Sequence, residues 1–138
     1  MRWMGLDIGL RRIGIAISDP LELFAQGHSV LERQKIERDL ETLTQIIAAE
    51  MVEGIVVGLP KNLNGTEGVM AEKIRDFGER LQKKTGMPLV FWDERLSTVA
   101  AERVLLEADL SRKKRKQKID QVAAVLILQN YLDFRKHH

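Results

Sequence analysis

Four acidic residues stand where the surrounding sequence predicts the ends of buried elements. Asp7 interrupts an apolar run near the N-terminus, Asp93 and Glu94 directly follow a second apolar run, and Asp120 opens a third. A carboxylate buried in an apolar strand is costly unless it is paired or binds a metal ion. These acids are therefore the first candidates for chemistry.

Structural alternatives exist for all four acids, and for Asp7 the alternative is a purely structural role. Asp120 at a helix start would cap the helix or interact with its dipole. Asp93 and Glu94 would pair with Arg95 or Lys118. Neighbouring residues on a strand point to opposite faces, so we expect only one of Asp93 and Glu94 to face a shared site.

Carboxylates that converge from distant segments would form an all-oxygen ligand set, and the chain has no cysteine. Such a set suits a hard cation, Mg²⁺ or Mn²⁺. Two such ions about 3.5–4 Å apart would activate a water and stabilise the leaving oxygen in phosphodiester cleavage. Arg95 would help to meet the transition-state charge.

Hydrophobic periodicity predicts the elements that must position these acids. Apolar or alternating runs indicate strands at 3–8, 13–18, 24–32, 54–58 and 89–92. Helical spacing indicates helices at 36–51, from Thr66 as N-cap to about 84, from Ser97 or Thr98 to about 108, and at 119–132. A hairpin followed by alternating helices and strands implies one α/β domain with helices on both faces of a mixed sheet. We expect five strands, a three-strand antiparallel hairpin unit plus two parallel strands.

Composition limits the class of protein. The 138 residues fit a single domain, 1–138. The absence of cysteine favours a reducing cytoplasm, and no apolar run reaches the roughly 18–20 residues that span a bilayer. We therefore expect a cytoplasmic protein with no membrane partner.

Basic charge is concentrated in one segment, 109–118, which we expect to be a flexible loop. Its basic residues are Arg112, Lys113, Lys114, Arg115, Lys116 and Lys118. The rest of the chain has more acidic than basic residues, although the whole chain carries +2. Such a run either contacts phosphates or is a solvated loop without a partner.

Glycines accompany the first acid. Gly5 and Gly9 flank Asp7, and Gly14 lies across the expected turn. The missing side chains would let a polymer backbone approach the acids, or would serve turn geometry alone.

Four segments together resemble the YqgF/RuvX family of bacterial proteins, described as Holliday-junction resolvases and precursor 16S rRNA nucleases. They read GLDIG through GIA at 5–16, VGLP with NGTE at 57–67, DERLST at 93–98, and KIDQVAA at 118–124. The resemblance covers nearly the whole chain. It implies a ribonuclease-H-like fold related to RuvC and trimming of the 5′ end of precursor 16S rRNA.

The resemblance carries a catalytic and metal-binding role onto Asp7, Glu94 and Asp120, with Asp93 and Arg95 as possible additions. RuvC resolvases usually have a fourth acid one helical turn after the last. That neighbourhood here holds Gln121, Ala123 and Ala124. The site thus has three clear ligands, which weakens the expectation of full resolvase activity.

Two further segments are expected to contact nucleic acid. The loop after the fourth strand offers Lys61, Asn62 and Asn64, although a helix-capping loop is the alternative. Beside a metal site, the basic run 112–118 would add sequence-independent affinity that falls with salt.

The sequence is also compatible with other functions. Actin-like or sugar-kinase-like phosphotransferases share the Asp-x-Gly turn, but they need a second lobe that 138 residues do not supply. A transcription or ribosome-assembly factor would bind nucleic acid without cutting. A resolvase of branched DNA would act as a symmetric dimer, whereas a trimming nuclease works as a monomer or weak homodimer.

Overall fold

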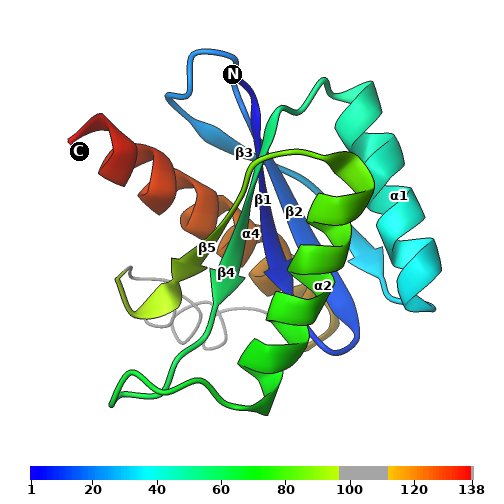
Figure 1. Cartoon of the computed structure of the whole chain (residues 1–138), viewed down its shortest axis with the longest axis vertical. Coiled ribbons are helices and arrows are strands. Elements are labelled where there is room, and N and C mark those ends of the chain that lie inside the picture. The colour runs from blue at the N-terminus through cyan, green and yellow to red at the C-terminus, as the bar shows by residue number, and fades with distance from the viewer. Residues whose placement is uncertain (97–111, 138) are drawn as a thin grey trace.

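Strands that are buried along their whole length build the centre of the sheet. The computed structural model describes residues 1–96 and 112–137. Five strands form one mixed sheet in the order β3-β2-β1-β4-β5 (Figure 1). Their bounds are β1 Trp3–Ile8, β2 Arg12–Ser18, β3 Ala25–Glu32, β4 Gly54–Leu59 and β5 Leu89–Asp93. The antiparallel β1-β2-β3 unit and the parallel pairs β1-β4 and β4-β5 confirm the expected mixed sheet.

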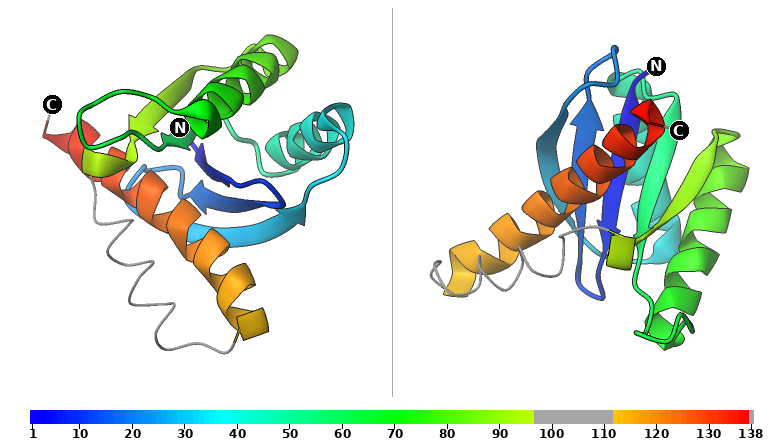
Figure 2. Two further views of the ribbon diagram at one scale, coloured as in Figure 1. Left: turned by 90° about the horizontal axis from the view of Figure 1, so that it is seen from below. Right: turned by 90° about the vertical axis from the view of Figure 1, so that its left-hand side faces the viewer.

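Helices cover both faces of this sheet. The helices α1 (Ile36–Ala49) and α2 (Val69–Thr85) lie together on one face, and α4 (Arg112–Lys136) crosses the other (Figure 2). A short 3₁₀ turn, η1 (Glu94–Leu96), follows β5. No helix in the described ranges is long and apolar enough to cross a membrane.

Strand alternation divides the core into two layers. On β2, Ile13, Ile15 and Ile17 pack toward α1 and α2, whereas Ala16 packs toward α4. On β1, Leu6 belongs to the first layer and Trp3 to the second. Residues of β1 with odd numbers, including Asp7, therefore face α4.

Glycines let α4 lie at backbone distance from the sheet. A Cβ atom on Gly14 would sit 1.9 Å from the Asp120 carbonyl oxygen, and one on Gly5 would sit 2.6 Å from Leu128 Cβ. The expectation that Gly5 and Gly14 leave room for a polymer backbone is therefore wrong, because α4 fills that space. Gly9 serves the turn, where its N–H donates to the Arg12 carbonyl at 2.8 Å.

Several expected boundaries differ in the structure. The second helix begins at Val69 with Gly68 as N-cap, and the Thr66 hydroxyl instead donates to Asn64 Oδ1 within the preceding loop. Residues 112–118 of the expected loop 109–118 form the first turns of α4. Lys, Arg and Gln are good helix formers, although their lack of apolar periodicity hides the helix. Residues 109–111 and the expected helix 97–108 lie outside the described residues.

The Gly14 contact predicts a large stability loss on adding one methyl group. Gly14→Ala should lower the free energy of unfolding by about 2–3 kcal/mol, because the clash is with backbone that cannot rotate away. Urea unfolding would measure the difference. Gly68→Ala is the control, since a Cβ there meets nothing within 4 Å. Its loss should stay below about 1 kcal/mol, the preference for Gly over Ala at an N-cap. Equal losses would refute the close contact.

Candidate active site

Asp7 lies near the carboxyl end of β1, on the face that α4 covers. The residue is only 8% exposed. Its antiparallel partner on β2 is Gly14, and Gly14 contacts the backbone of Asp120. Residues 7 and 120 are thus brought to the same part of the sheet by one glycine.

Side chains on the face of the sheet opposite α4 hold the turn after Asp7 in place. Arg33 Nη1 donates to the Gly9 carbonyl at 2.8 Å, and Arg33 Nε lies 3.4 Å from Asp39 Oδ2. Asp39 is buried, and its other oxygen accepts from the Gln34 N–H at 2.9 Å. This chain of contacts fixes the turn that joins Asp7 to β2.

Glu94 follows β5 and lies over β4. Trp92 packs in the core layer under α4, so alternation turns Asp93 away from α4. A Cβ atom on Gly58 of β4 would sit 2.8 Å from Glu94 Oε1, and 2.4 Å from Ile127 Cδ1 of α4. Glu94 therefore joins Asp7 on the α4 face.

Asp120 lies inside α4, well after its start at Arg112. The alternative that Asp120 caps this helix is thus wrong. Its Oδ2 accepts a hydrogen bond from Arg12 Nε at 2.9 Å, and the two side chains are 22% and 21% exposed. Sequence reasoning missed Arg12, which stands on β2 two residues before Gly14 and hence on the same face.

All three acids offer oxygen ligands on one face, and oxygen is the type of ligand that a hard cation prefers. In the described ranges, however, no three acidic or histidine residues lie close enough together to hold a metal ion. The Arg12 guanidinium supplies positive charge to Asp120 in this arrangement. Cation binding would therefore need the side chains to rearrange, and those of Glu94 and Asp120 are partly exposed.

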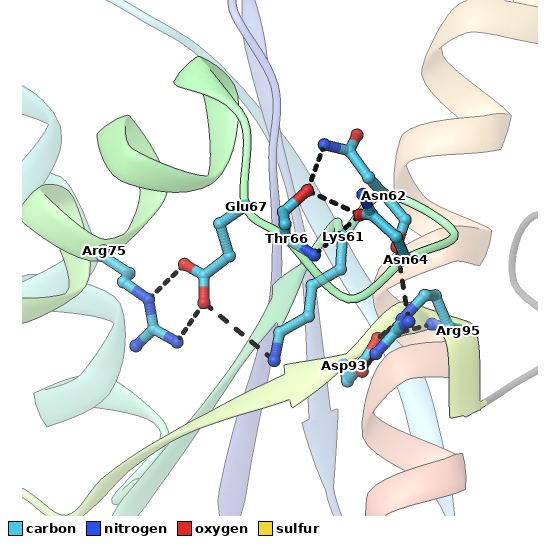
Figure 3. A network of polar contacts seen from close by, with 8 residues as sticks. All are labelled: Lys61, Asn62, Asn64, Thr66, Glu67, Arg75, Asp93 and Arg95. Atoms are coloured by element: carbon cyan, nitrogen blue, oxygen red, sulfur yellow. Dashed lines mark hydrogen bonds and ion pairs between the residues drawn. The ribbon is translucent and has the colours of Figure 1, made fainter.

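Asp93 and Arg95 form a separate clamp on the loop between β4 and α2. Arg95 Nη2 lies 2.8 Å from Asp93 Oδ2, and its Nη1 donates to the carbonyls of Asn62 and Leu63 at 3.3 and 3.4 Å (Figure 3). The Arg95 hydrogen bond holds the pKa of the Asp93 carboxyl below its ordinary value of 3.8, against the opposing effect of burial. The Asp93 carboxylate is thus already paired with Arg95 in this clamp.

The clamped loop is also ordered from within. Asn62 Nδ2 donates to Thr66 Oγ1 at 2.9 Å, and Asn64 Oδ1 accepts from the Thr66 N–H at 3.1 Å. Gly65 has a φ of 88°, which favours glycine. The two asparagines expected to contact nucleic acid therefore shape the loop that carries them.

Lys61 belongs to a charged chain that connects this loop to α2. Its Nζ lies 4.0 Å from Glu67 Oε2, and Arg75 donates to both Glu67 oxygens at 2.5 and 2.8 Å. The Arg75 hydrogen bonds lower the pKa of the Glu67 carboxyl. Figure 3 shows Lys61 between Glu67 and Asp93, where its charge favours both carboxylates.

The basic residues of 112–118 lie in the turns of α4 that precede Asp120, as the backbone shows. Their side chains lie outside the described part of the structure. The contact with phosphate stays a prediction.

The Asp93–Arg95 clamp predicts a pH-dependent effect on stability. A carboxyl whose pKa falls on folding contributes stability above its unfolded pKa and loses it as pH drops through the folded pKa. Asp93→Asn should therefore destabilise the protein near neutral pH, and the difference from wild type should shrink below about pH 4. Urea unfolding across this range would measure it. The control, Asp133→Asn, alters an exposed acid of α4, and a pH-independent Asp93→Asn loss would contradict the ion pair.

Comparisons with known proteins agree with the fold and the motifs. The family model RuvX, described as Holliday junction resolvase, matches residues 1–134. A relative from Halothermothrix orenii is 58% identical over 135 residues, covering 98% of this chain and 96% of that protein. One from Desulforamulus reducens is 55% identical over 133 residues, covering 96% and 97%. Both bear the name "Putative pre-16S rRNA nuclease".

A solved structure of Thermus thermophilus RuvC in complex with a Holliday junction substrate has the same fold. The TM-score is 0.68 at 14% identity, covering 99% of this chain and 96% of that one. The expected RuvC-like, ribonuclease-H-like fold and the family resemblance are thus confirmed. With a family model matched over nearly its whole length, the chain belongs to the RuvX family.

Proposed function

We propose that this protein is a divalent-metal-dependent nuclease that hydrolyses phosphodiester bonds at the 5′ end of precursor 16S rRNA. One observation carries the proposal: Asp7, Glu94 and Asp120 come from three distant segments to the α4 face of the sheet. The names of the close relatives support the choice of substrate. The cytoplasm, where ribosomes are assembled, is the corresponding location.

Asp7, Glu94 and Asp120 would hold Mg²⁺ or Mn²⁺ in this proposal. The bound ions would supply an activated water and a counter-charge for the leaving oxygen. Asp7 contributes a carboxylate fixed by the β1–β2 hairpin. Glu94 and Asp120 would contribute carboxylates that are partly exposed.

Nucleic-acid binding would come from two cationic segments beside these acids. Lys61 stands on the ordered loop that Arg95 clamps next to β5, and the basic turns of α4 lead into Asp120. Phosphate contacts by lysine and arginine give affinity that falls steeply with salt. Asn62 and Asn64 would act by keeping the loop in place as well as by contact.

Junction resolution is the second candidate, because the fold matches RuvC in a complex with junction DNA. The residues one helical turn after Asp120 speak against it. Ala123 and Ala124 of α4 are fully buried in the core layer between this helix and the sheet, and they offer no fourth ligand. We therefore favour a trimming nuclease that acts as a monomer or weak homodimer.

The proposal predicts which substitutions abolish cutting. Asp7→Asn, Glu94→Gln and Asp120→Asn should each reduce cleavage of labelled precursor 16S rRNA by at least roughly a hundredfold, since loss even of a ligand's supporting partner costs ten- to a hundredfold. Cleavage should need Mg²⁺ or Mn²⁺ and stop with chelator. A four-way DNA junction in parallel reactions would separate RNA trimming from resolution.

Two controls make this test sharp. Asp76→Asn removes an exposed carboxylate of α2 that pairs with Arg80 and should cut like wild type. Asp93→Asn should retain more activity than Glu94→Gln, because Asp93 serves the loop clamp. Binding of both substrates without metal-dependent cutting, unchanged in Asp7→Asn, would instead indicate a non-catalytic binding factor.

A further inference from the structure

Arg12 forms an ion pair that joins the sheet to the candidate active site. It stands at the start of β2, and its Nε donates to Asp120 Oδ2 at 2.9 Å across 108 positions of sequence. Both side chains are about four-fifths buried, with 21% and 22% exposed. Partial burial weakens screening by water and salt, so this pair is stronger than a typical surface pair.

The same pair competes with a cation for Asp120. A guanidinium that occupies Oδ2 blocks one of the oxygens that a divalent ion would use. Its positive charge also opposes a second positive charge nearby. Metal binding through Asp120 therefore requires Arg12 to give up or share its hydrogen bond.

Arg12 has a second acceptor within reach. Its register partner on β3 is Glu32, and Arg12 Nη1 lies 4.0 Å from Glu32 Oε1, a carboxylate that is 69% exposed. The guanidinium therefore lies between the buried acid site and an open edge of the molecule. Its planar set of donors matches a phosphate group in a bidentate manner.

We propose that Arg12 is a charge-exchange residue of this site. It neutralises Asp120 in the cation-free protein, releases that carboxylate when a divalent cation binds, and then contacts a phosphate of the nucleic-acid strand. The inference rests on the proposed function, because it requires Asp120 to be a cation ligand. No covalent step is involved.

The first test measures cation affinity without nucleic acid. Mn²⁺ binding to the full chain, followed by electron paramagnetic resonance of free Mn²⁺, would compare wild type with Arg12→Gln. Affinity should rise roughly three- to tenfold in the variant, because a competitor and a repulsive charge are removed. Arg11→Gln is the matched control, since Arg11 is an exposed neighbour of equal charge, and it should stay within about twofold.

A Mn²⁺ affinity that does not rise in Arg12→Gln would overturn the inference. Unchanged or weaker Mn²⁺ binding in Arg12→Gln means that Arg12 positions Asp120 for the cation and is not exchanged. Arg12→Lys keeps the charge and should bind Mn²⁺ less tightly than Arg12→Gln does. Circular dichroism and urea unfolding of each variant would establish that the fold is retained.

The second test examines the phosphate contact. A synthetic RNA spanning the 5′ end of 16S rRNA would be bound at several KCl concentrations, with Ca²⁺ at a fixed level or with chelator. Ca²⁺ takes the same oxygen ligands. Arg12→Gln should weaken binding and reduce the salt slope by about 0.7, the value for one single-strand phosphate contact, in Ca²⁺ only. Equal slopes for wild type and variant in Ca²⁺ would refute the contact.

Asp120→Asn separates the two proposals. If wild type binds Mn²⁺ and Asp120→Asn binds it at least roughly tenfold more weakly, the proposed metal site stands. A failure of Arg12→Gln to bind more tightly then refutes the role of Arg12 alone. If Asp120→Asn binds Mn²⁺ like wild type, the site assignment fails, and the inference about Arg12 fails with it.

Discussion

The contact of α4 with the glycine-lined face of the sheet is the interaction on which the rest of the structure depends. Glycines on β1, β2, β3 and β4 contact this helix, and at Gly14 the contact is between backbones. Ordinary helix-on-sheet packing keeps the helix a side chain's width away. Here the helix backbone lies closer to the sheet. A residue on the sheet-facing side of α4 therefore lies beside Asp7. The geometry of the acids is therefore a consequence of missing side chains.

Aromatic packing fixes the other end of the same helix. Tyr131 lies edge-on to Trp3 and Trp92, with ring centroids 5.3 and 5.8 Å apart. Arg135 lies over the Trp3 ring and pairs with Glu22. The glycine contact near Asp120 and this aromatic cluster are separated by about three turns of α4. Two anchors on one rigid helix determine both its position and its direction across the sheet.

The sequence predicted most of the sheet, because its signals are local. Alternation at Ile13, Ile15 and Ile17 identifies β2 and, with β1, the hairpin that holds Asp7. The same rule of alternation indicates that Asp93 and Glu94 face apart, as the structure shows. The start of α4 was missed because a run of basic residues has helix propensity without apolar periodicity. Thr66 was assigned wrongly as a cap because the helix begins only at Val69, and the Thr66 hydroxyl instead accepts from Asn62 Nδ2 within the loop.

The contact between Arg12 and Asp120 could not be predicted from hydrophobic periodicity. Its partner Asp120 is 108 residues away, and no local pattern reports a contact made only after α4 has docked. The pair also places a positive charge beside one of the acids on this face. A partly buried carboxylate without a partner is costly, and the Arg12 guanidinium supplies the counter-charge of Asp120. In the proposed charge exchange, the same guanidinium would balance Asp120 before a cation binds and would contact a phosphate afterwards. Neutralising a partly buried acid and binding the substrate would thus be two uses of one positive charge.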